Sequence, residues 1–304
     1  MANDYSDKVV KYTQFMDELA EKASVTSVLD GANSQLVGEF NGAGTVNLPK
    51  LVLDGLADYD RSTGFADGSA SIDWEPYKLR WDRGKGFEID DMDNDETLQV
   101  MTLNMLGSFV RDKVVPEIDA VRLSTYASNA GTTVAKTITA EKDALAAILD
   151  AEAAIEDVAD IDGTILFMTA AFRALVKRAV PWRFGRGEQP DANFDTFDGL
   201  RVVTVPSSRF MTSFTLSSDG FKATGTGDAD QTHVTGKVST AAKAINFMLV
   251  KPEAVCQIKK TEKLRYFAPN VNQDKDAHKW QYRIFHDAIV ISERKPLVYV
   301  HTAA

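Results

Sequence analysis

Residues 71–96 read SIDWEPYKLRWDRGKGFEIDDMDNDE, and this stretch decides how the rest of the chain is interpreted. Its apolar side chains fall on even positions at Ile72 and Trp74, and on odd positions from Tyr77 onward. Because successive side chains of a strand face opposite ways, the pattern predicts an extended ribbon whose apolar face changes side near Pro76. We therefore expect a bent arm with aromatic residues on both faces, which needs a partner such as another subunit to cover it.

The segments on either side of this arm predict a hairpin and a long helix. Residues 45–53 (TVNLPKLVL) predict a short strand that pairs with the arm, and residues 55–70, dense in Gly, Asp and Ser, predict a broad hairpin tip. After the arm, an apolar stripe predicts an unusually long helix that ends at about Ser128. Because Pro116 lies inside that helix, we expect a kink or a break near Val115.

The remainder of the chain predicts an α/β or α+β body around one sheet, because strand and helix patterns alternate. The expected elements are helices capped by Thr139 and Thr169, strands at 163–168, 199–205 and 245–250, two closing strands near the C-terminus, an aromatic and charged loop at 181–197, and a surface insertion at 213–240.

Composition bounds the function. The chain has 304 residues, of which 44% are hydrophobic and 26% charged, as in an ordinary soluble globular protein. Its net charge of -10 argues against tight general binding to nucleic acid. Apolar runs fall far below the roughly 20 residues needed to span a bilayer, and the acidic start of the chain predicts no signal peptide. The single cysteine, Cys256, excludes an internal disulfide and fits a reducing cytoplasm.

An acidic run before the long helix is the strongest apparent site for chemistry. Asp91, Asp93 and Asp95 match the first three ligand positions of a calcium loop. However, Glu96 stands where the sharp turn needs glycine, and Thr102 stands where a bidentate glutamate belongs. Helix capping and complementation of the helix dipole explain these acids more simply.

The other polar motifs give no support to catalysis. The four histidines are scattered, and the chain has no serine-nucleophile elbow and no glycine-rich phosphate motif. We therefore expect no catalytic residue, no cofactor and no metal site. Arg80, Arg83 and Lys85 beside Tyr77 and Trp81 resemble a basic-aromatic nucleic-acid patch, but the acids a few residues on favour charge complementarity between subunits.

The order of an N-terminal arm, a long hairpin, a long kinked helix and an α/β body resembles the major capsid proteins of tailed bacteriophages. Their Hong Kong-type capsid fold is shared with encapsulins. The stretches that carry the resemblance are GLADYDRSTGF at 55–65, DRGKGFEIDDMDNDET at 82–97, VPEID at 115–119, GLRVVTVPSSR at 199–209 and INFMLVKPEAV from 245 onward.

The resemblance implies an α+β phage capsid fold. Its expected divisions are an N-terminal arm (1–44), an extended hairpin called the E-loop that lies over a neighbouring subunit (45–95), a peripheral domain with a spine helix (96–138), an axial α/β domain (139–250) and C-terminal strands that return to the peripheral domain (251–304). The expected intersubunit contacts on the arm are Trp74, Tyr77, Leu79, Trp81 and Arg83. The expected capsomer-centre residues are Trp182, Arg183, Phe184 and Arg186.

The resemblance also implies a function and partners. A coat protein of this kind is not an enzyme; it self-assembles through hexamers and pentamers into an icosahedral shell around double-stranded DNA, which it faces without specific recognition. Because the segment before the hairpin is short, we expect a separate scaffolding protein, together with a portal and a decoration protein, and no membrane partner. The expected location is the virion capsid, after assembly in the host cytoplasm.

Two other functions stay open at this point. One is an encapsulin-like compartment shell that encloses a cargo enzyme. The other, from a different class, is an acid-dependent hydrolase that uses Asp91 and Asp93.

Overall fold

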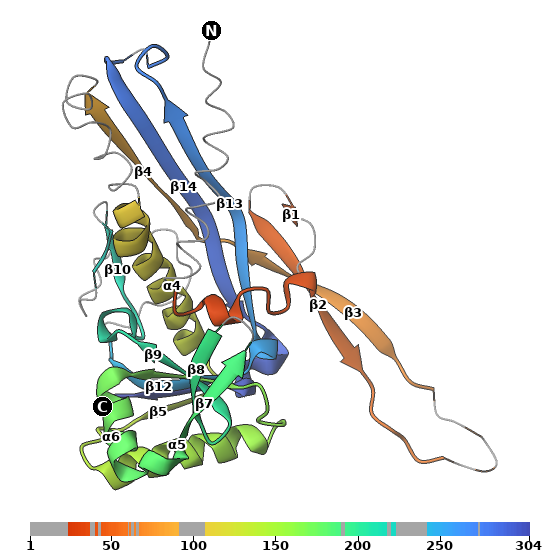
Figure 1. The fold of residues 1–304 in the computed structure, drawn as a ribbon. Helices are drawn as coiled ribbons and strands as arrows, with labels where there is room; N and C mark the ends of the chain where they lie inside the picture. Colours follow the sequence, from red (N-terminus) through yellow and green to blue (C-terminus); the bar gives the residue numbers. More distant parts are fainter. Residues whose placement is uncertain are drawn as a thin grey trace. The chain divides into compact units, whose positions relative to one another are not determined.

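The computed structural model describes residues 24–36, 40–41, 44–59, 61, 64, 67–90, 107–189, 192–217, 220–222, 242–272 and 274–304. The chain divides into two compact units (Figure 1). The hairpin unit is Asn33–Leu79, and the larger unit combines Met1–Ala32 with Arg80–Ala304. Among the described residues, no helix is long and apolar enough to cross a membrane.

The hairpin unit is an antiparallel sheet in the order β1-β2-β3, formed by β1 (Phe40–Asn41), β2 (Thr45–Leu53) and β3 (Ala70–Lys78). The bounds of β2 are those expected. The expected change of face near Pro76 agrees with the structure, in which Ile72 and Trp74 lie on one face of β3 and Tyr77 on the other. The strand runs through Pro76 in unbroken register with β2, and Pro76 lies opposite Asn47. Proline has no N–H to donate, and β3 tolerates it because this strand is an edge of its sheet.

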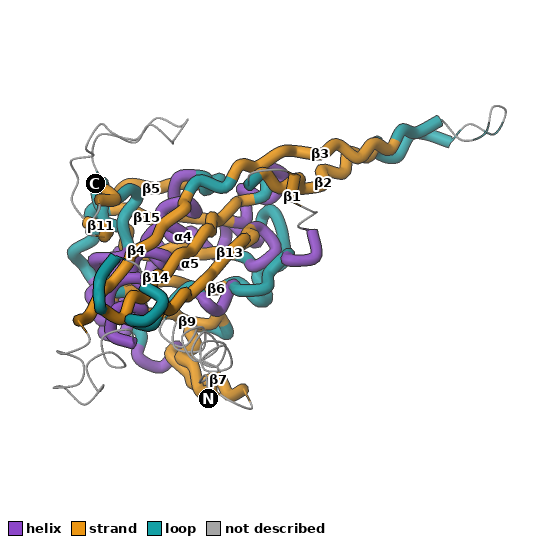
Figure 2. Tube along the Cα trace, turned by 90° about the horizontal axis from the view of Figure 1, so that it is seen from above, coloured by secondary structure: helices purple, strands orange, loops and turns teal. Residues whose placement is uncertain are grey.

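The expected single arm over 71–96 is corrected. After Leu79 and Arg80, the chain enters β4 (Trp81–Asp90), which belongs to the larger unit. There β4 pairs with β14 (Ala277–Val290), and β14 pairs with β13 (Val255–Phe267). Figure 2 shows these three strands side by side. The stretch is therefore two strands in two sheets, and residues 91–96 lie outside the described part of the chain.

A seven-stranded sheet is the second main sheet of the larger unit. Its order is β5-β15-β12-β6-β9-β8-β7, with parallel pairing only between β15 and β5 and between β6 and β9. Its strands are β5 (Thr132–Ala135), β6 (Ile165–Thr169), β7 (Phe184–Gln189), β8 (Ala192–Phe197), β9 (Leu200–Val205), β12 (Ile245–Val250) and β15 (Val298–Thr302).

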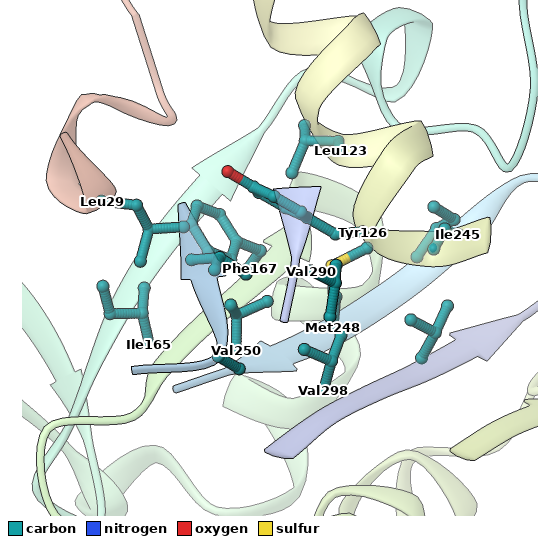
Figure 3. Close-up of a cluster of buried hydrophobic side chains, with 14 of the residues drawn as sticks. Leu29, Leu123, Tyr126, Ile165, Phe167, Ile245, Met248, Val250, Val290 and Val298 are labelled. Atoms are coloured by element: carbon teal, nitrogen blue, oxygen red, sulfur yellow. The ribbon is translucent and has the colours of Figure 1, made fainter. Parts of the chain in front are cut away.

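Both faces of this sheet are buried, which explains why its central strands are continuously apolar. On β6, Phe167 packs into one hydrophobic cluster and Leu166 into the other. The helices α5 (Glu141–Glu156) and α6 (Ala170–Ala179) contribute to the cluster on one face, and α4 (Val115–Ser128) contributes Leu123 and Tyr126 to the other. Figure 3 shows Tyr126 among the strand residues of this second cluster.

Near Val115, where a kink or a break was expected, the helix widens into a π-turn and continues. The described helix begins at Gly107, passes through the π-helix η3 (Val110–Val114) and continues as α4. The N–H of Val115 donates to the carbonyl of Val110, five residues back. Because Pro116 has no N–H and its ring crowds the preceding turn, a π-turn accommodates it where a regular α-turn would clash.

A buried carboxylate fastens the N-terminal segment to α4. Asp119 has no exposed surface and accepts hydrogen bonds from the hydroxyl of Ser24 at 2.6 Å and from the hydroxyl of Thr26 at 2.8 Å. The backbone N–H groups of Val25 and Thr26 also donate to it, and Arg209 forms an ion pair with it at 3.0 Å. A buried charge with this many donors is satisfied, so it stabilises a single position for the segment.

Three other expectations about elements had mixed outcomes. Thr169 does cap α6, because its hydroxyl accepts from the N–H of Phe172 at 3.3 Å, whereas Ala140 rather than Thr139 precedes α5. The loop expected at 181–197 is instead a 3-10 turn (η4, Pro181–Arg183) followed by the β7–β8 hairpin. Of the insertion expected at 213–240, the structure describes only the hairpin of β10 (Thr215–Ser217) and β11 (Gly220–Lys222) and the residues adjoining it.

Candidate subunit-interaction surfaces

The hairpin unit exposes large apolar side chains on one face of β3. Ile72 and Trp74 expose 60% and 58% of their surface, and Trp74 lies opposite Pro49 of β2. Residues of the other face are more covered: Tyr77 is half-buried and pairs with Val46, which is fully buried. Because a Trp and an Ile exposed side by side are costly in water, this face is a candidate contact surface.

The tip of the hairpin unit is closed by an acid and adds more exposed apolar groups. The backbone N–H and the hydroxyl of Ser69 both donate to Asp54 at 2.7 Å, and these bonds lower the pKa of Asp54. Beyond this closure, Leu56 is fully exposed and Tyr59 is mostly exposed. The hairpin therefore presents apolar groups along its length and at its end.

The five residues expected on one arm divide between the two units. Trp74, Tyr77 and Leu79 lie in the hairpin unit, and Leu79 is buried. Trp81 and Arg83 lie on β4 in the larger unit. The structure thus does not bring the five residues together as one contact surface.

Trp81 and Arg83 make contacts within the larger unit. The half-buried indole of Trp81 lies with its centroid 5.8 Å from that of Phe214. Arg83 donates from Nε to Glu117 at 2.7 Å, on the far side of η3 in sequence. Sequence reasoning missed Glu117 because it lies 34 residues away and no local pattern links the two.

Arg80, once a candidate for a basic-aromatic patch, is also paired within the chain. Its Nε and Nη2 donate to the two carboxylate oxygens of Asp287 at 2.9 and 3.0 Å, and its backbone N–H donates to the same group. Asp287 is only 3% exposed, and the bonds to it raise the pKa of Arg80. This bidentate pair fixes the start of β4.

The residues expected at a capsomer centre lie around the β7–β8 hairpin. Trp182 is 78% exposed in the turn before β7, Arg183 forms an ion pair with Asp198 at 2.6 Å, and Phe184 packs on Phe197 with centroids 5.2 Å apart. Arg186 lies on β7, where the structure describes the backbone only. The exposed Trp182 is therefore the second candidate contact.

A carboxyl group with a raised pKa lies close to this hairpin. Burial, with smaller contributions from Asp198 and Glu156, raises the pKa of Glu152 to about 7, while Arg183 opposes the shift. Glu152 belongs to α5, so the charge of the hairpin region is coupled to a group that titrates near neutral pH.

The described residues give little support to catalytic chemistry. Among them, no cluster of His, Cys, Asp or Glu is arranged to hold a metal ion. Asp91, Asp93 and Asp95 lie outside the described part of the chain. Cys256 is fully buried, and burial raises its pKa to about 11, so this thiol stays protonated and packed.

Comparisons with known proteins bear on the fold. No family model matches the chain, and no curated protein matches its sequence significantly. Solved structures do match, with the mature capsid of bacteriophage PhiM1 aligning at a TM-score of 0.60 and 11% identity, over 87% of this chain and 83% of that chain. The capsid of cyanophage P-SCSP1u aligns at a TM-score of 0.58 and 11% identity, over 87% and 85% of the two chains.

A third structure, from Mycobacterium phage Che8, aligns at a TM-score of 0.54 with 13% identity, over 85% of this chain and 84% of that chain. These alignments cover most of each chain, and identities this low are informative about fold alone. The expected fold class is confirmed: the chain has the α+β fold of the major capsid proteins of phages.

Proposed function

We propose that this protein is the major capsid protein of a tailed bacteriophage, which self-assembles through hexamers and pentamers into an icosahedral shell around double-stranded DNA. The observation that carries the proposal is the phage capsid fold, which extends over 87% of the chain in the alignments to the PhiM1 and P-SCSP1u capsids. The exposed apolar face of the hairpin unit supports it independently, because shells need many modest contacts that add up by multivalency.

In this proposal each part of the chain has a role in the shell. The hairpin unit, Asn33–Leu79, is the E-loop that reaches a neighbouring subunit. The sheet β13-β14-β4 with η3 and α4 is the peripheral domain, and the seven-stranded sheet with α5 and α6 is the axial domain. The β7–β8 hairpin, with the exposed Trp182 before it, faces the capsomer centre.

The remaining elements of the proposal concern chemistry and partners. The protein acts as a structural component rather than as an enzyme, and it needs no cofactor. Its partners are copies of itself, a separate scaffolding protein, a portal and a decoration protein, and its location is the virion after assembly in the host cytoplasm. The net charge of -10 is consistent with a shell that faces DNA without binding it tightly.

The proposal is tested by expressing the full chain alone and with its neighbouring genes, and imaging the products by electron microscopy. We expect closed shells, or hexamers and pentamers. A monodisperse monomer under every condition would contradict the proposed function.

A paired variant tests the role of the hairpin unit. Ile72→Ser combined with Trp74→Ser removes the exposed apolar face, so we expect a folded subunit with an unchanged melting temperature and a strongly reduced shell yield. The control is Val271→Ser, which removes an apolar side chain that is similarly exposed, at 59%, but belongs to the larger unit. Shell yield that falls equally in both variants, or in neither, would refute the role of the hairpin while leaving the fold unaffected.

A further inference from the structure

One surface ion pair joins the two turns at the base of the β7–β8 hairpin. Arg183, in the turn η4 before β7, donates from Nη1 to Asp198 at 2.6 Å, and the backbone N–H of Asp198 donates to the carbonyl of Arg183 at 3.3 Å. The two side chains are 35% and 37% exposed. Because an ion pair this exposed contributes little to stability, either partner can be exchanged at small cost.

The exposed Trp182 shares the first of these turns with Arg183. Its side chain is 78% exposed, and it directly precedes Arg183 in η4. In the second turn, Asp198 has a φ of +47° and Gly199 a φ of +87°. Because a residue other than glycine seldom adopts a positive φ, this turn depends on its contacts, of which the pair with Arg183 is one. A change of partner by Arg183 would therefore act on both turns.

Glu152 of α5 is a second acid within electrostatic reach of Arg183. Its Oε1 is buried and has no hydrogen-bond partner among the residues that the structure describes. The charges that act on it are those of Asp198, Arg183 and Glu156, and only that of Arg183 favours its ionised form. The cations of α6, the helix that packs against α5, are either exposed or paired with Asp195; they are Arg173, Lys177 and Arg178. One cation, Arg183, thus serves two acids.

The protonation state of Glu152 decides which acid has the greater need of Arg183. Burial, together with Asp198 and Glu156, raises the pKa of Glu152 to about 7, so the group is neutral below that pH and ionised above it. A neutral carboxyl needs no counter-ion, which leaves Arg183 with Asp198. An ionised carboxylate with a buried oxygen and no donor is costly, and a guanidinium with five N–H donors can supply one. Arg183 is therefore drawn to Glu152 when Glu152 ionises.

We propose that Arg183 exchanges its partner from Asp198 to Glu152 when Glu152 loses its proton, and that this exchange moves the turn η4 with the exposed Trp182. The base of the β7–β8 hairpin is then a proton-sensitive switch, in which a buried acid on α5 sets the position of an aromatic side chain at the surface. The inference rests on contacts within the larger unit and does not depend on the proposed capsid function.

The direct test is fluorine NMR of the full-length protein labelled with fluorotryptophan, at a concentration at which light scattering does not change with pH. The variant Trp182→Phe identifies the resonance of Trp182 among those of the four tryptophans. We expect this resonance to move with pH, with a midpoint near pH 7. A Trp182 resonance that stays fixed between pH 5 and 9, a range of about two units on either side of that midpoint, would overturn the proposal.

Four variants assign the response to its groups. Glu152→Gln should abolish it, whereas Asp150→Asn, which changes an exposed acid of the same helix, should leave it unchanged. Asp198→Asn removes the competing acid but suits the left-handed turn, so the midpoint should fall by at least about half a pH unit. Arg183→Gln should leave Trp182 with less than about half of its shift, because the connection is lost. A response that survives Glu152→Gln, a midpoint unmoved by Asp198→Asn, or a full shift in Arg183→Gln would each refute the switch.

Discussion

The strands β3 and β4 are neighbours in sequence and similar in length, yet their aromatic side chains differ in how far they are buried. Each is an edge strand of a three-stranded antiparallel sheet. On β4, Phe87 is half-buried against Phe109 of the spine helix, whereas on β3 Trp74 remains 58% exposed. The same alternation of aromatic side chains therefore builds a core where a helix covers the strand, and an exposed apolar face, which is a candidate contact surface, on the strand without such a cover.

The largest expected effect concerns the ion pair at the start of β4. Asp287→Ala removes the acceptor of the Arg80 guanidinium and of the backbone N–H groups of Arg80 and Ala288, so we expect the free energy of unfolding to fall by about 2 to 3 kcal/mol. The matched control is Asp82→Ala, which breaks the exposed pair between Asp82 and Arg283 on the same sheet. Denaturant unfolding measures both, and a similar loss in the two variants would contradict the buried anchor.

The second comparison sets the two tryptophans against each other. Trp81→Ala should lower the free energy of unfolding by about 2 kcal/mol, because the half-buried ring packs near Phe214. Trp74→Ala should change it by less than about 0.5 kcal/mol, because that ring is largely in solvent. Shell yield should respond in the reverse order: at a temperature at which both variants are folded, Trp74→Ala should reduce the yield more than Trp81→Ala does. If Trp74→Ala destabilised the subunit as much as Trp81→Ala, the contrast between the strands would be lost.

Two glycines of β4 test how closely this strand packs against β14. A Cβ at Gly84 would lie 2.9 Å from the carbonyl oxygen of Tyr282, whereas a Cβ at Gly86 would lie 3.8 Å from that of Trp280. We expect Gly84→Ala to cost about 1 to 2 kcal/mol through strain, and Gly86→Ala to be neutral or slightly stabilising. Thermal melting of both variants checks this, and equal melting temperatures would show that β14 yields to the added methyl.

The smallest effect extends the comparison to a third edge, the β7–β8 hairpin. The pKa of Glu152 is raised to about 7 in the folded protein, so the folded state holds this proton more strongly than the unfolded chain does. Stability should therefore fall as pH rises from about 4.5 to 7, by about 1 kcal/mol after allowance for solvent screening.

Glu152→Gln tests this pH dependence. Because glutamine does not titrate, the variant should show a flatter stability profile over that pH range and a higher melting temperature at pH 8 than the parent protein. A profile that keeps its slope would assign the pH dependence to another group.

Local sequence patterns predicted the elements whose burial depends on residues close to them in sequence. The strand β2 and the helix α6 with its Thr169 cap were predicted closely, and Pro116 alone pointed to an irregular turn near Val115, where the structure has a π-turn. The division after Leu79 was not, because it depends on the buried pair between Arg80 and Asp287, which are 207 residues apart. Two residues so far apart in sequence cannot be recognised as a pair from a local sequence pattern.

The strand β13 was missed for a different reason. A β-bulge between Lys259 and Thr261 shifts its pairing with β14 by one residue. On the face that packs on the cores, buried residues therefore fall at odd positions such as Val255 before the bulge, and at even positions such as Leu264 after it. Because the alternation of buried and exposed residues changes phase at the bulge, inside a polar stretch, it cannot be recognised as a strand pattern from the sequence.

The candidate surfaces also divide into residues that the sequence predicted and residues that only the fold brings together. Trp74 was predicted as a contact from the alternation along residues 71–96, and Trp182 from the resemblance to capsid proteins; both side chains are exposed, and their contacts stay predictions. A pocket of about 250 Å³ beside His286 was not anticipated, since its residues come from β4, from the spine helix and from β14. Only the tertiary fold brings those three segments together.

The π-turn at Val110–Val114 has a consequence for how the protein can vary. A π-turn holds one residue more than an α-turn, so deletion of one residue there would leave a continuous α-helix. Because the wide turn absorbs its extra residue, the side chains before and after such a deletion would keep nearly the same angular relation. Phe109 would then stay against Phe87 while Ile118 kept its place beside the pocket. Elsewhere in this helix one residue more or less would rotate the two ends by about 100° relative to each other, so the π-turn marks the position where the length of the helix can change by one residue without moving its packing face.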